Sequence, residues 1–347
     1  MSAPAPELSQ AAEVAVRDYM AVRAGENVLI TSDTAGDRDV AEALFVTAQR
    51  AGAHAVLLIS PQLPFQGRLA DPYVTPTLAG AVLACDVWID LTFPYLAGSH
   101  VYDEALKTDR VRYMLGGDMT ADGLVRLFGR VDLDRYYAVH RAFDDLINAA
   151  TGRPVRISNA LGTDVTFRLG PRAFEKPRRA DKPGLYIVPG SCTMFPEVES
   201  VQGTIRVGSI FHEYYTPLIE PMTLEVDGKI RAVKGGGNER KVADRALRRA
   251  GGGEYGYVIH FTHGIHPAAR VTGRSFIEDM RGVGNDAVGL GLPFWVPGGG
   301  ENHPDAVLTM QSIELDGQRI VEDGAIVSPP DLARLADALT PTWGGQA

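Results

Sequence analysis

The feature that most constrains the fold is a regular alternation, in the first half of the chain, of short apolar runs with segments of helical periodicity. Residues 27–31 form an apolar run, and in residues 37–50 apolar side chains recur every three or four positions. The pattern continues with strand-like runs at residues 53–59, 87–91 and 111–115 and with apolar or helical segments at residues 77–84, 101–107 and 133–150. Continuous apolar strands separated by helices indicate a parallel sheet covered on both faces.

The second half of the chain has the pattern of antiparallel strands. Apolar and polar residues alternate in residues 155–158 and 164–169. Asp-Gly pairs at residues 227–228 and 316–317 lie between strand-like runs, which is a strong hairpin signal. This half is therefore predicted to be mainly β.

One helix in the second half is well delimited, with Asn238 as its expected N-cap and glycines 251–253 at its end. A length of 347 residues suits two domains. We therefore predict an α/β fold with an N-terminal parallel-sheet α/β domain, residues 1–152, and a C-terminal, mainly antiparallel α+β domain, residues 153–347.

Composition excludes several classes of partner. The formal net charge of −9 disfavours nucleic acid, whose binding depends on cationic side chains that meet phosphates. No apolar run approaches the roughly 20 residues that span a bilayer, and the N-terminus lacks the features of a signal peptide, so we expect a cytoplasmic protein without membrane contact. Cys85 and Cys192, the latter in a Gly/Pro-rich segment, have no disulfide-like spacing and are expected to be free thiols.

A nucleotide-binding function is also disfavoured. The segment after the first predicted strand, residues 32–37, contains one glycine where the dinucleotide fingerprint needs three. The glycine triplets at residues 235–237, 251–253 and 298–300 lack the context of a phosphate-binding loop, and no serine-nucleophile elbow is present.

The sequence His303-Pro304-Asp305, at the start of a strand-like run, is the strongest chemical signal. Residues two apart on a strand point to the same face, so this histidine and aspartate can bind one metal ion together. His260 ends another apolar run and is the expected third ligand. Two imidazoles and one carboxylate form the set associated with non-haem Fe(II), although the same donors also bind manganese, zinc and nickel.

The neighbouring histidines leave alternatives open. A single histidine at a strand end is more often a hydrogen-bonded core or surface residue than a ligand. His263 and His266 could serve as alternative ligands, as donors to the ligands, or as ordinary loop residues. His260 is preferred as the ligand because it ends the apolar run.

Three stretches of the second half, residues 188–204, 260–267 and 298–308, resemble the thermophilic metallo-aminopeptidase superfamily and, within it, the 2,5-dihydroxypyridine 5,6-dioxygenase family. The resemblance implies that the peptidases hold two metal ions with carboxylates and a further histidine at positions where this chain has Ser191, His260 and Ala287. With those groups replaced, the site is predicted to hold one ion.

The resemblance implies a function as well: cleavage of a small hydroxylated N-heteroaromatic ring by Fe(II) and dioxygen, with an N-formylmaleamate-type product. His100, in the loop after the third strand of the N-terminal domain, is the expected catalytic base, and its alternative is a surface histidine at a helix start. The expected substrate-binding residues are Leu96, Ser191, His263 and His266. Relatives assemble as oligomers, so we also expect a homo-oligomer.

Three other functions remain as alternatives. A two-metal aminopeptidase would release amino acids from peptides. A non-catalytic binding module would tolerate substitution of His260, His303 and Asp305. A family member that cleaves another hydroxylated ring would share the site and differ in substrate.

Overall fold

The structure is a computed structural model that describes residues 5–172, 179–293, 295–296, 299 and 303–342. It contains two compact units, each described here by itself. The first comprises the described residues of Met1–Val131, Glu175–Pro189 and Thr342–Ala347, and the second those of Asp132–Phe174 and Gly190–Pro341. The predicted division at residue 152 into separate domains remains a prediction.

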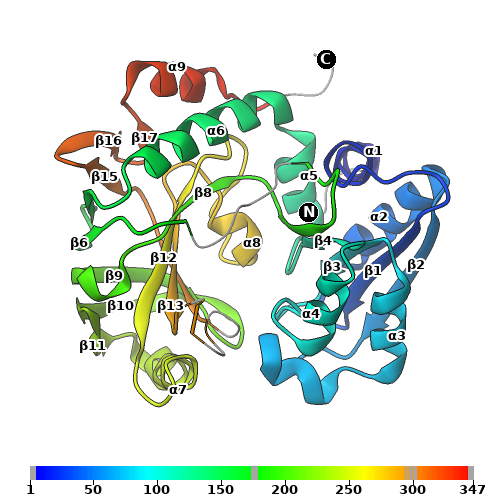
Figure 1. Cartoon of the computed structure of the whole chain (residues 1–347), viewed down its shortest axis with the longest axis horizontal. Coiled ribbons are helices and arrows are strands. Elements are labelled where there is room, and N and C mark those ends of the chain that lie inside the picture. Colours follow the sequence, from blue (N-terminus) through cyan, green and yellow to red (C-terminus); the bar gives the residue numbers. More distant parts are fainter. Residues whose placement is uncertain (1–4, 173–178, 294, 297–298, 300–302, 343–347) are drawn as a thin grey trace. The chain divides into compact units, whose positions relative to one another are not determined.

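The first unit is built on a parallel five-stranded sheet, as the apolar runs predict (Figure 1). The strand order is β2-β1-β3-β4-β7, with bounds β1 Asn27–Asp33, β2 His54–Ser60, β3 Val87–Leu91, β4 Arg112–Leu115 and β7 Gly184–Ile187. The last strand comes from a segment beyond the predicted N-terminal domain, and the sequence analysis did not identify it.

Helices accompany the parallel sheet between its strands. Their bounds are α1 Ala5–Glu13, α2 Arg38–Arg50, α3 Pro76–Ala84, α4 His100–Lys107 and α5 Ala121–Gly129, with a π-helical turn at Val14–Tyr19 and a 3-10 segment at Gly67–Tyr73. Helix α1 packs against α2 and α5, and α3 packs against α4. Apolar residues of α3, α4 and β3 form one buried core, which includes Trp88 and Leu96.

The second unit contains a twelve-stranded sheet in which every pairing of strands is antiparallel. The main path is β17-β16-β15-β5-β6-β9-β14-β13-β12-β8, and β10 pairs with β9 and β11. The strands are β5 Pro154–Ser158, β6 Asp164–Arg168, β8 Ser191–Met194, β9 Gln202–Phe211, β10 Tyr215–Asp227, β11 Lys229–Gly235, β12 Tyr257–Gly264, β13 Asp286–Gly291, β14 Asp305–Leu308, β15 Ser312–Leu315, β16 Gln318–Glu322 and β17 Ala325–Ile326. The predicted α/β fold with a parallel and an antiparallel part is confirmed.

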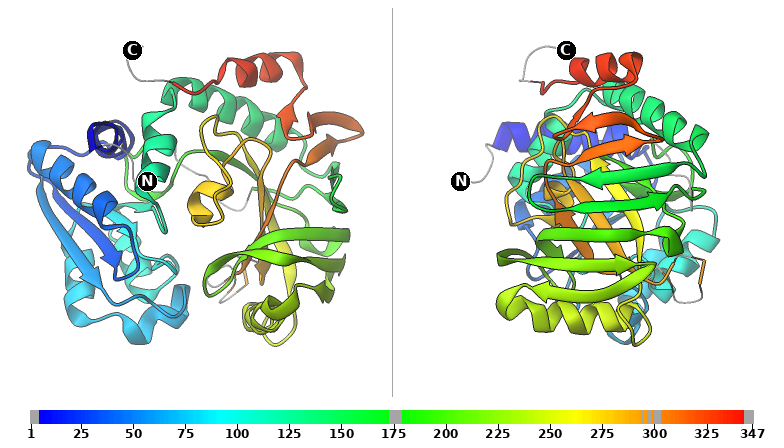
Figure 2. Two further views of the ribbon diagram at one scale, coloured as in Figure 1. Left: turned by 180° about the vertical axis from the view of Figure 1, so that it is seen from behind. Right: turned by 90° about the vertical axis from the view of Figure 1, so that its left-hand side faces the viewer.

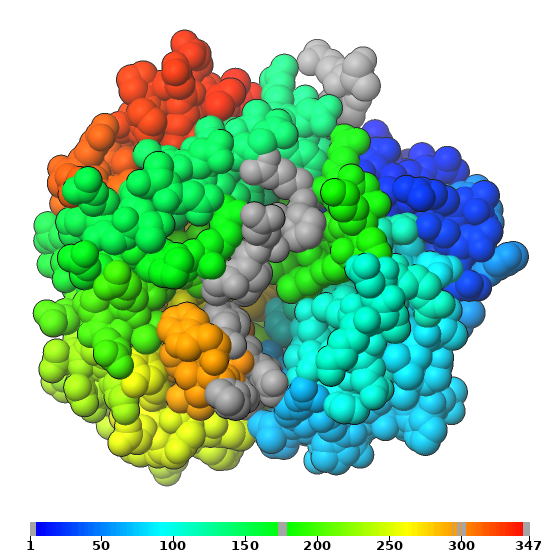
Figure 3. Space-filling view, viewed as in Figure 1, coloured from blue at the N-terminus to red at the C-terminus, as the bar shows by residue number. Residues whose placement is uncertain are grey.

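The helices of this unit are α6 Leu133–Ala149, α7 Arg240–Ala250, α8 Phe276–Asp279 and α9 Pro330–Ala338, with 3-10 turns at Val198–Ser200 and Gly237–Glu239. Helices α6 and α9 lie side by side, and α6 packs on β8 (Figure 2). In Figure 3 the side chains of α6 (green) and α9 (red) form a continuous part of the surface of this unit. Asn238 was wrongly predicted as the cap of α7, because it lies within the preceding 3-10 turn.

Two further expectations concern the cysteines and the membrane. Cys85 and Cys192 form no disulfide and are both buried, and Cys192 lies in β8. Among the described residues, no helix is both long and apolar enough to cross a membrane.

Candidate metal centre

Three neighbouring strands of the second unit position the predicted metal ligands. His260 lies on β12, Asp305 begins β14, and β13 runs between them. On β13, Gly289 is the register partner of both His260 and Asp305. Residues directly opposite each other on neighbouring strands have side chains on the same face, so the imidazole and the carboxylate approach each other across a position that has no side chain. His303, two residues before Asp305, completes the group.

The three donor groups lie at nearly equal distances from one another. The Nε2 atoms of His260 and His303 are 3.4 Å apart. Asp305 places Oδ1 3.4 Å from the Nε2 of His260 and Oδ2 3.3 Å from the Nε2 of His303. All three side chains are largely buried, with 11%, 21% and 7% of the side-chain surface exposed for His260, His303 and Asp305. Solvent can therefore screen their interactions only weakly.

These separations fit a single metal ion. Ligand atoms about 2.1 Å from one ion are roughly 3.0 Å apart in an octahedral arrangement and roughly 3.4 Å apart in a tetrahedral one. The structure thus brings His260, His303 and Asp305 close enough together for all three to bind one ion. Their roles as ligands remain a prediction that this geometry supports.

Gly289 provides independent evidence that the space between the strands is kept open. A Cβ atom at this position would lie 2.3 Å from Nε2 of His260, which is closer than any real contact. Any other residue would therefore push the imidazole away from Asp305. The sequence analysis missed this residue, although a glycine inside an apolar strand is a known signal of close approach.

Asp286, at the start of β13, limits the negative charge near the site. Its Oδ1 accepts a hydrogen bond from the amide of Thr262, 2.6 Å away. Burial, with a smaller contribution from the charge of Asp305, raises the pKa of Asp286 well above its usual range and favours the neutral acid.

The comparisons with known proteins decide the family. The sequence model of a family described as 2,5-dihydroxypyridine 5,6-dioxygenase (NicX) matches residues 12–328. The chain belongs to this dioxygenase family. The resemblance seen in the three sequence stretches is thus confirmed. It is a ring-cleaving oxidoreductase family, and it implies a metal cofactor, a small aromatic substrate and dioxygen.

Solved structures show the same fold. The structure titled as 2,5-dihydroxypyridine dioxygenase from Pseudomonas putida KT2440 matches with a TM-score of 0.74 and 22% identity, over 96% of this chain and 100% of that one. Wild-type AmpT from Thermus thermophilus matches with a TM-score of 0.64 and 14% identity, over 93% of this chain and 99% of that one. No curated protein sequence matches the chain significantly.

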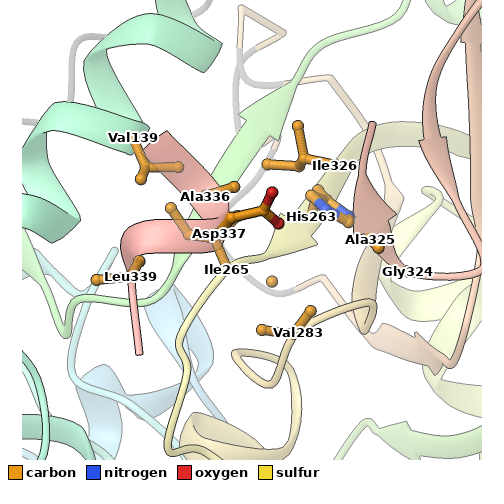
Figure 4. A pocket seen from close by; sticks show the side chains of 11 residues that line it. Val139, His263, Ile265, Val283, Gly324, Ala325, Ile326, Ala336, Asp337 and Leu339 are labelled. Atoms are coloured by element: carbon orange, nitrogen blue, oxygen red, sulfur yellow. The ribbon is translucent and has the colours of Figure 1, made fainter. Parts of the chain in front are cut away.

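Two of the predicted substrate residues of this dioxygenase, His263 and His266, lie in surroundings that give no direct support to substrate contact. His263 is three positions from His260 on β12 and therefore points to the opposite face of the sheet. Its ring stacks on Phe143 of α6, with 5.8 Å between centroids, and lines a cavity of about 100 Å³ between α6, α9 and β17 (Figure 4). Nδ1 of the buried His266 accepts hydrogen bonds from the amides of Ala268 and Ala269 and so caps a turn.

The remaining predicted site residues lie in three different settings. Ser191 is buried, begins β8 and pairs with Gly264. Leu96 belongs to the apolar core of the first unit, which gives no support to a role in substrate contact. His100 begins α4 and is mostly exposed, with Nε2 3.1 Å from Glu104 and Nδ1 3.1 Å from Arg68.

Proposed function

We propose that this member of the dioxygenase family opens the ring of 2,5-dihydroxypyridine with dioxygen to give N-formylmaleamate, using one Fe(II) ion held by His260, His303 and Asp305. The observation that carries the proposal is the group of three side chains beside Gly289 whose donor nitrogens and oxygens lie 3.3–3.4 Å apart. Two neutral imidazoles and one carboxylate on one side of an ion leave the remaining positions open for small molecules.

The residues of the site have different roles toward the ion. When bound, the ferrous ion would offer open positions at which dioxygen and the ring meet, and the ring itself would be the group that is oxidised. His260 and His303 provide neutral nitrogen donors, and Asp305 provides the compensating negative charge. Gly289 keeps the imidazole of His260 in place, because any side chain there would collide with it.

We also propose that His100 accepts the proton of a ring hydroxyl. It begins the helix that follows β3 and the loop 92–99, and parallel α/β sheets often present functional groups beyond the carboxyl ends of their strands. In the structure its Nδ1 contacts Arg68 and its Nε2 contacts Glu104, so one of these contacts must open before the ring accepts a proton. His100→Gln is expected to lower kcat by about 10² or more.

The decisive test is dioxygen uptake by protein reconstituted anaerobically with Fe(II), followed together with loss of the absorbance of 2,5-dihydroxypyridine. Uptake matched by ring loss is expected in the wild type and in His54→Gln, which alters an exposed histidine of β2. His303→Ala should abolish both. If one iron is bound and no uptake occurs, the substrate is another hydroxylated ring. If amino acids are released from peptides instead, the proposal is wrong.

Two further proposals concern a substrate contact and the oligomeric state. We propose that Ser191, rather than Leu96, contacts the substrate, because its polar side chain begins a strand of the same sheet as the three donors. A Ser191→Ala variant should raise KM more than it lowers kcat. We also propose a homo-oligomer, which light scattering on the purified chain tests directly.

A further inference from the structure

A second group of side chains of types that bind metals comes from α6 and β8, on the opposite face of the sheet from the first. His140 and Asp144 are four residues apart on this helix and so project on one side of it. Cys192 lies on β8, the strand against which α6 packs. It pairs in register with His263, whose ring stacks on α6, so the thiol is on the face that the helix covers. His140 and Asp144 are 6% and 8% exposed, and Cys192 is fully buried.

The distances within this group are those of ligands to one ion. One nitrogen of His140, one carboxylate oxygen of Asp144 and the sulfur of Cys192 all lie within 4.8 Å of one another. Nδ1 of His140 is 3.1 Å from Oδ2 of Asp144, yet it makes no hydrogen bond with any group in the described parts of the chain. Two ligands of one ion have this relation, because each directs its lone pair at the metal and lies beside the other.

An ordinary ion-pair network explains the group less well. Arg172 contacts Oδ2 of Asp144 at 3.1 Å and accounts for the charge of that carboxylate. This contact does not explain why Nδ1 of His140 is buried beside the carboxylate without a hydrogen bond. A buried polar atom that lacks a hydrogen bond destabilises the folded state. Carboxylates that bind metals are commonly held in place by such an additional partner.

We propose that His140, Asp144 and Cys192 form a second, buried metal site that binds Zn²⁺ and fastens α6 to β8. Thiolate, imidazole and carboxylate are all ligands that zinc binds, and an anionic thiolate and carboxylate favour a divalent ion. His263, a fully buried imidazole whose two nitrogens have no hydrogen-bond partner among residues 5–172, 179–293 and 303–342, is the register partner of Cys192 on β12. The proposal requires only the first three residues.

This site differs from the dioxygenase site in a way that an experiment can detect. The first group contains no sulfur, so a cobalt–thiolate charge-transfer band can arise only from a cysteine site. Metal-free protein refolded with Co²⁺ is expected to show this near-ultraviolet band. Cys192→Ser should lose it and should bind one Zn²⁺ fewer per chain than the wild type. Cys85→Ser, which alters the other buried cysteine, should keep both properties.

Two further variants separate the proposal from effects on folding or on the first site. His140→Gln keeps the thiol and is expected to weaken Co²⁺ binding more than tenfold, with circular dichroism unchanged. His303→Ala should retain the cobalt band although it lacks dioxygenase activity. The proposal fails if the wild type shows no band, or if the band survives in Cys192→Ser. Neither result would affect the dioxygenase assignment, which dioxygen uptake tests separately.

Discussion

At the scale of single residues, Gly289 gives the sharpest prediction. A methyl group there would lie 2.3 Å from Nε2 of His260 and would displace the imidazole from the position that one ion requires. Gly289→Ala is therefore expected to weaken Fe(II) binding by at least about tenfold, which corresponds to about 1.4 kcal/mol. Anaerobic titration with Fe(II) measures this change.

The matched control for Gly289→Ala is Gly208→Ala on β9. A Cβ atom at Gly208 would meet only the carbonyl oxygen of Val307, at 3.9 Å, which is an ordinary contact. This variant should bind iron as the wild type does. Equal affinities for the two variants would show that the ring of His260 can move aside at little cost, and the argument from Gly289 would then fail.

His263 gives a prediction about acid stability. Burial lowers the pKa of His263 from 6.5 to about 4, so the folded protein keeps this ring neutral where the unfolded chain protonates it. Above pH 6.5 this residue does not affect the free energy of unfolding, because the ring is neutral in both states. As the pH falls from 6.5 to about 4, only the unfolded chain takes up the proton, and the free energy of unfolding falls by about 3 kcal/mol in total. His263→Phe, which retains stacking on Phe143, should flatten this part of the curve.

Denaturant unfolding between pH 7 and pH 4 measures that effect. His54→Gln, at an exposed position of β2, serves as the control and should follow the wild-type curve. If His263→Phe loses as much stability in acid as the wild type, another group is responsible for the dependence.

At the scale of elements, the sequence predicted those whose pattern is local. The strands β1, β3 and β4 are short apolar runs, and α2 has a clear helical period, so each was predicted near its observed bounds. The strand β7 was not predicted, because its segment Gly-Leu-Tyr-Ile has no alternation and joins the sheet only through a long-range pairing with β4. Tertiary pairing of this kind leaves no local signal.

The same distinction holds for the candidate site. His303 and Asp305 were predicted together because their spacing places both on one face of a strand. Gly289 was missed, because its meaning depends on the neighbouring strands β12 and β14. His140 and Asp144 show a local helical spacing, but their relation to Cys192 depends on the packing of α6 on β8.

The start of α6 provides a test at this scale. Asp132 caps the helix, and its Oδ1 accepts hydrogen bonds from the amides of Asp134 and Arg135, at 3.0 and 3.1 Å. Asp132→Ala should lower the free energy of unfolding by about 1 kcal/mol, whereas Asp132→Asn retains a capping oxygen and should lower it far less. Urea titration compares the two, and equal losses would mean that the cap contributes little.

At the scale of the whole molecule, metal binding should be coupled to folding. His260 and Asp305 come from strands separated by β13, and His303 lies 43 residues after His260, so an unfolded chain does not assemble the three donors. A ligand that binds only the folded state raises its stability, by about 2.7 kcal/mol when its free concentration is one hundred times the Kd. Anaerobic Fe(II) should therefore raise the unfolding temperature of the wild type in a concentration-dependent way.

His303→Ala is the control that separates this coupling from general effects of the ion. It removes one donor and leaves the group under α6 intact, so any stabilisation that remains in this variant must come from elsewhere in the chain. We expect the increase in unfolding temperature with Fe(II) to be lost in His303→Ala and kept in Cys192→Ser. An increase of the same size in His303→Ala would contradict the assignment of His303 as a ligand, because the ion would then be stabilising the fold without it.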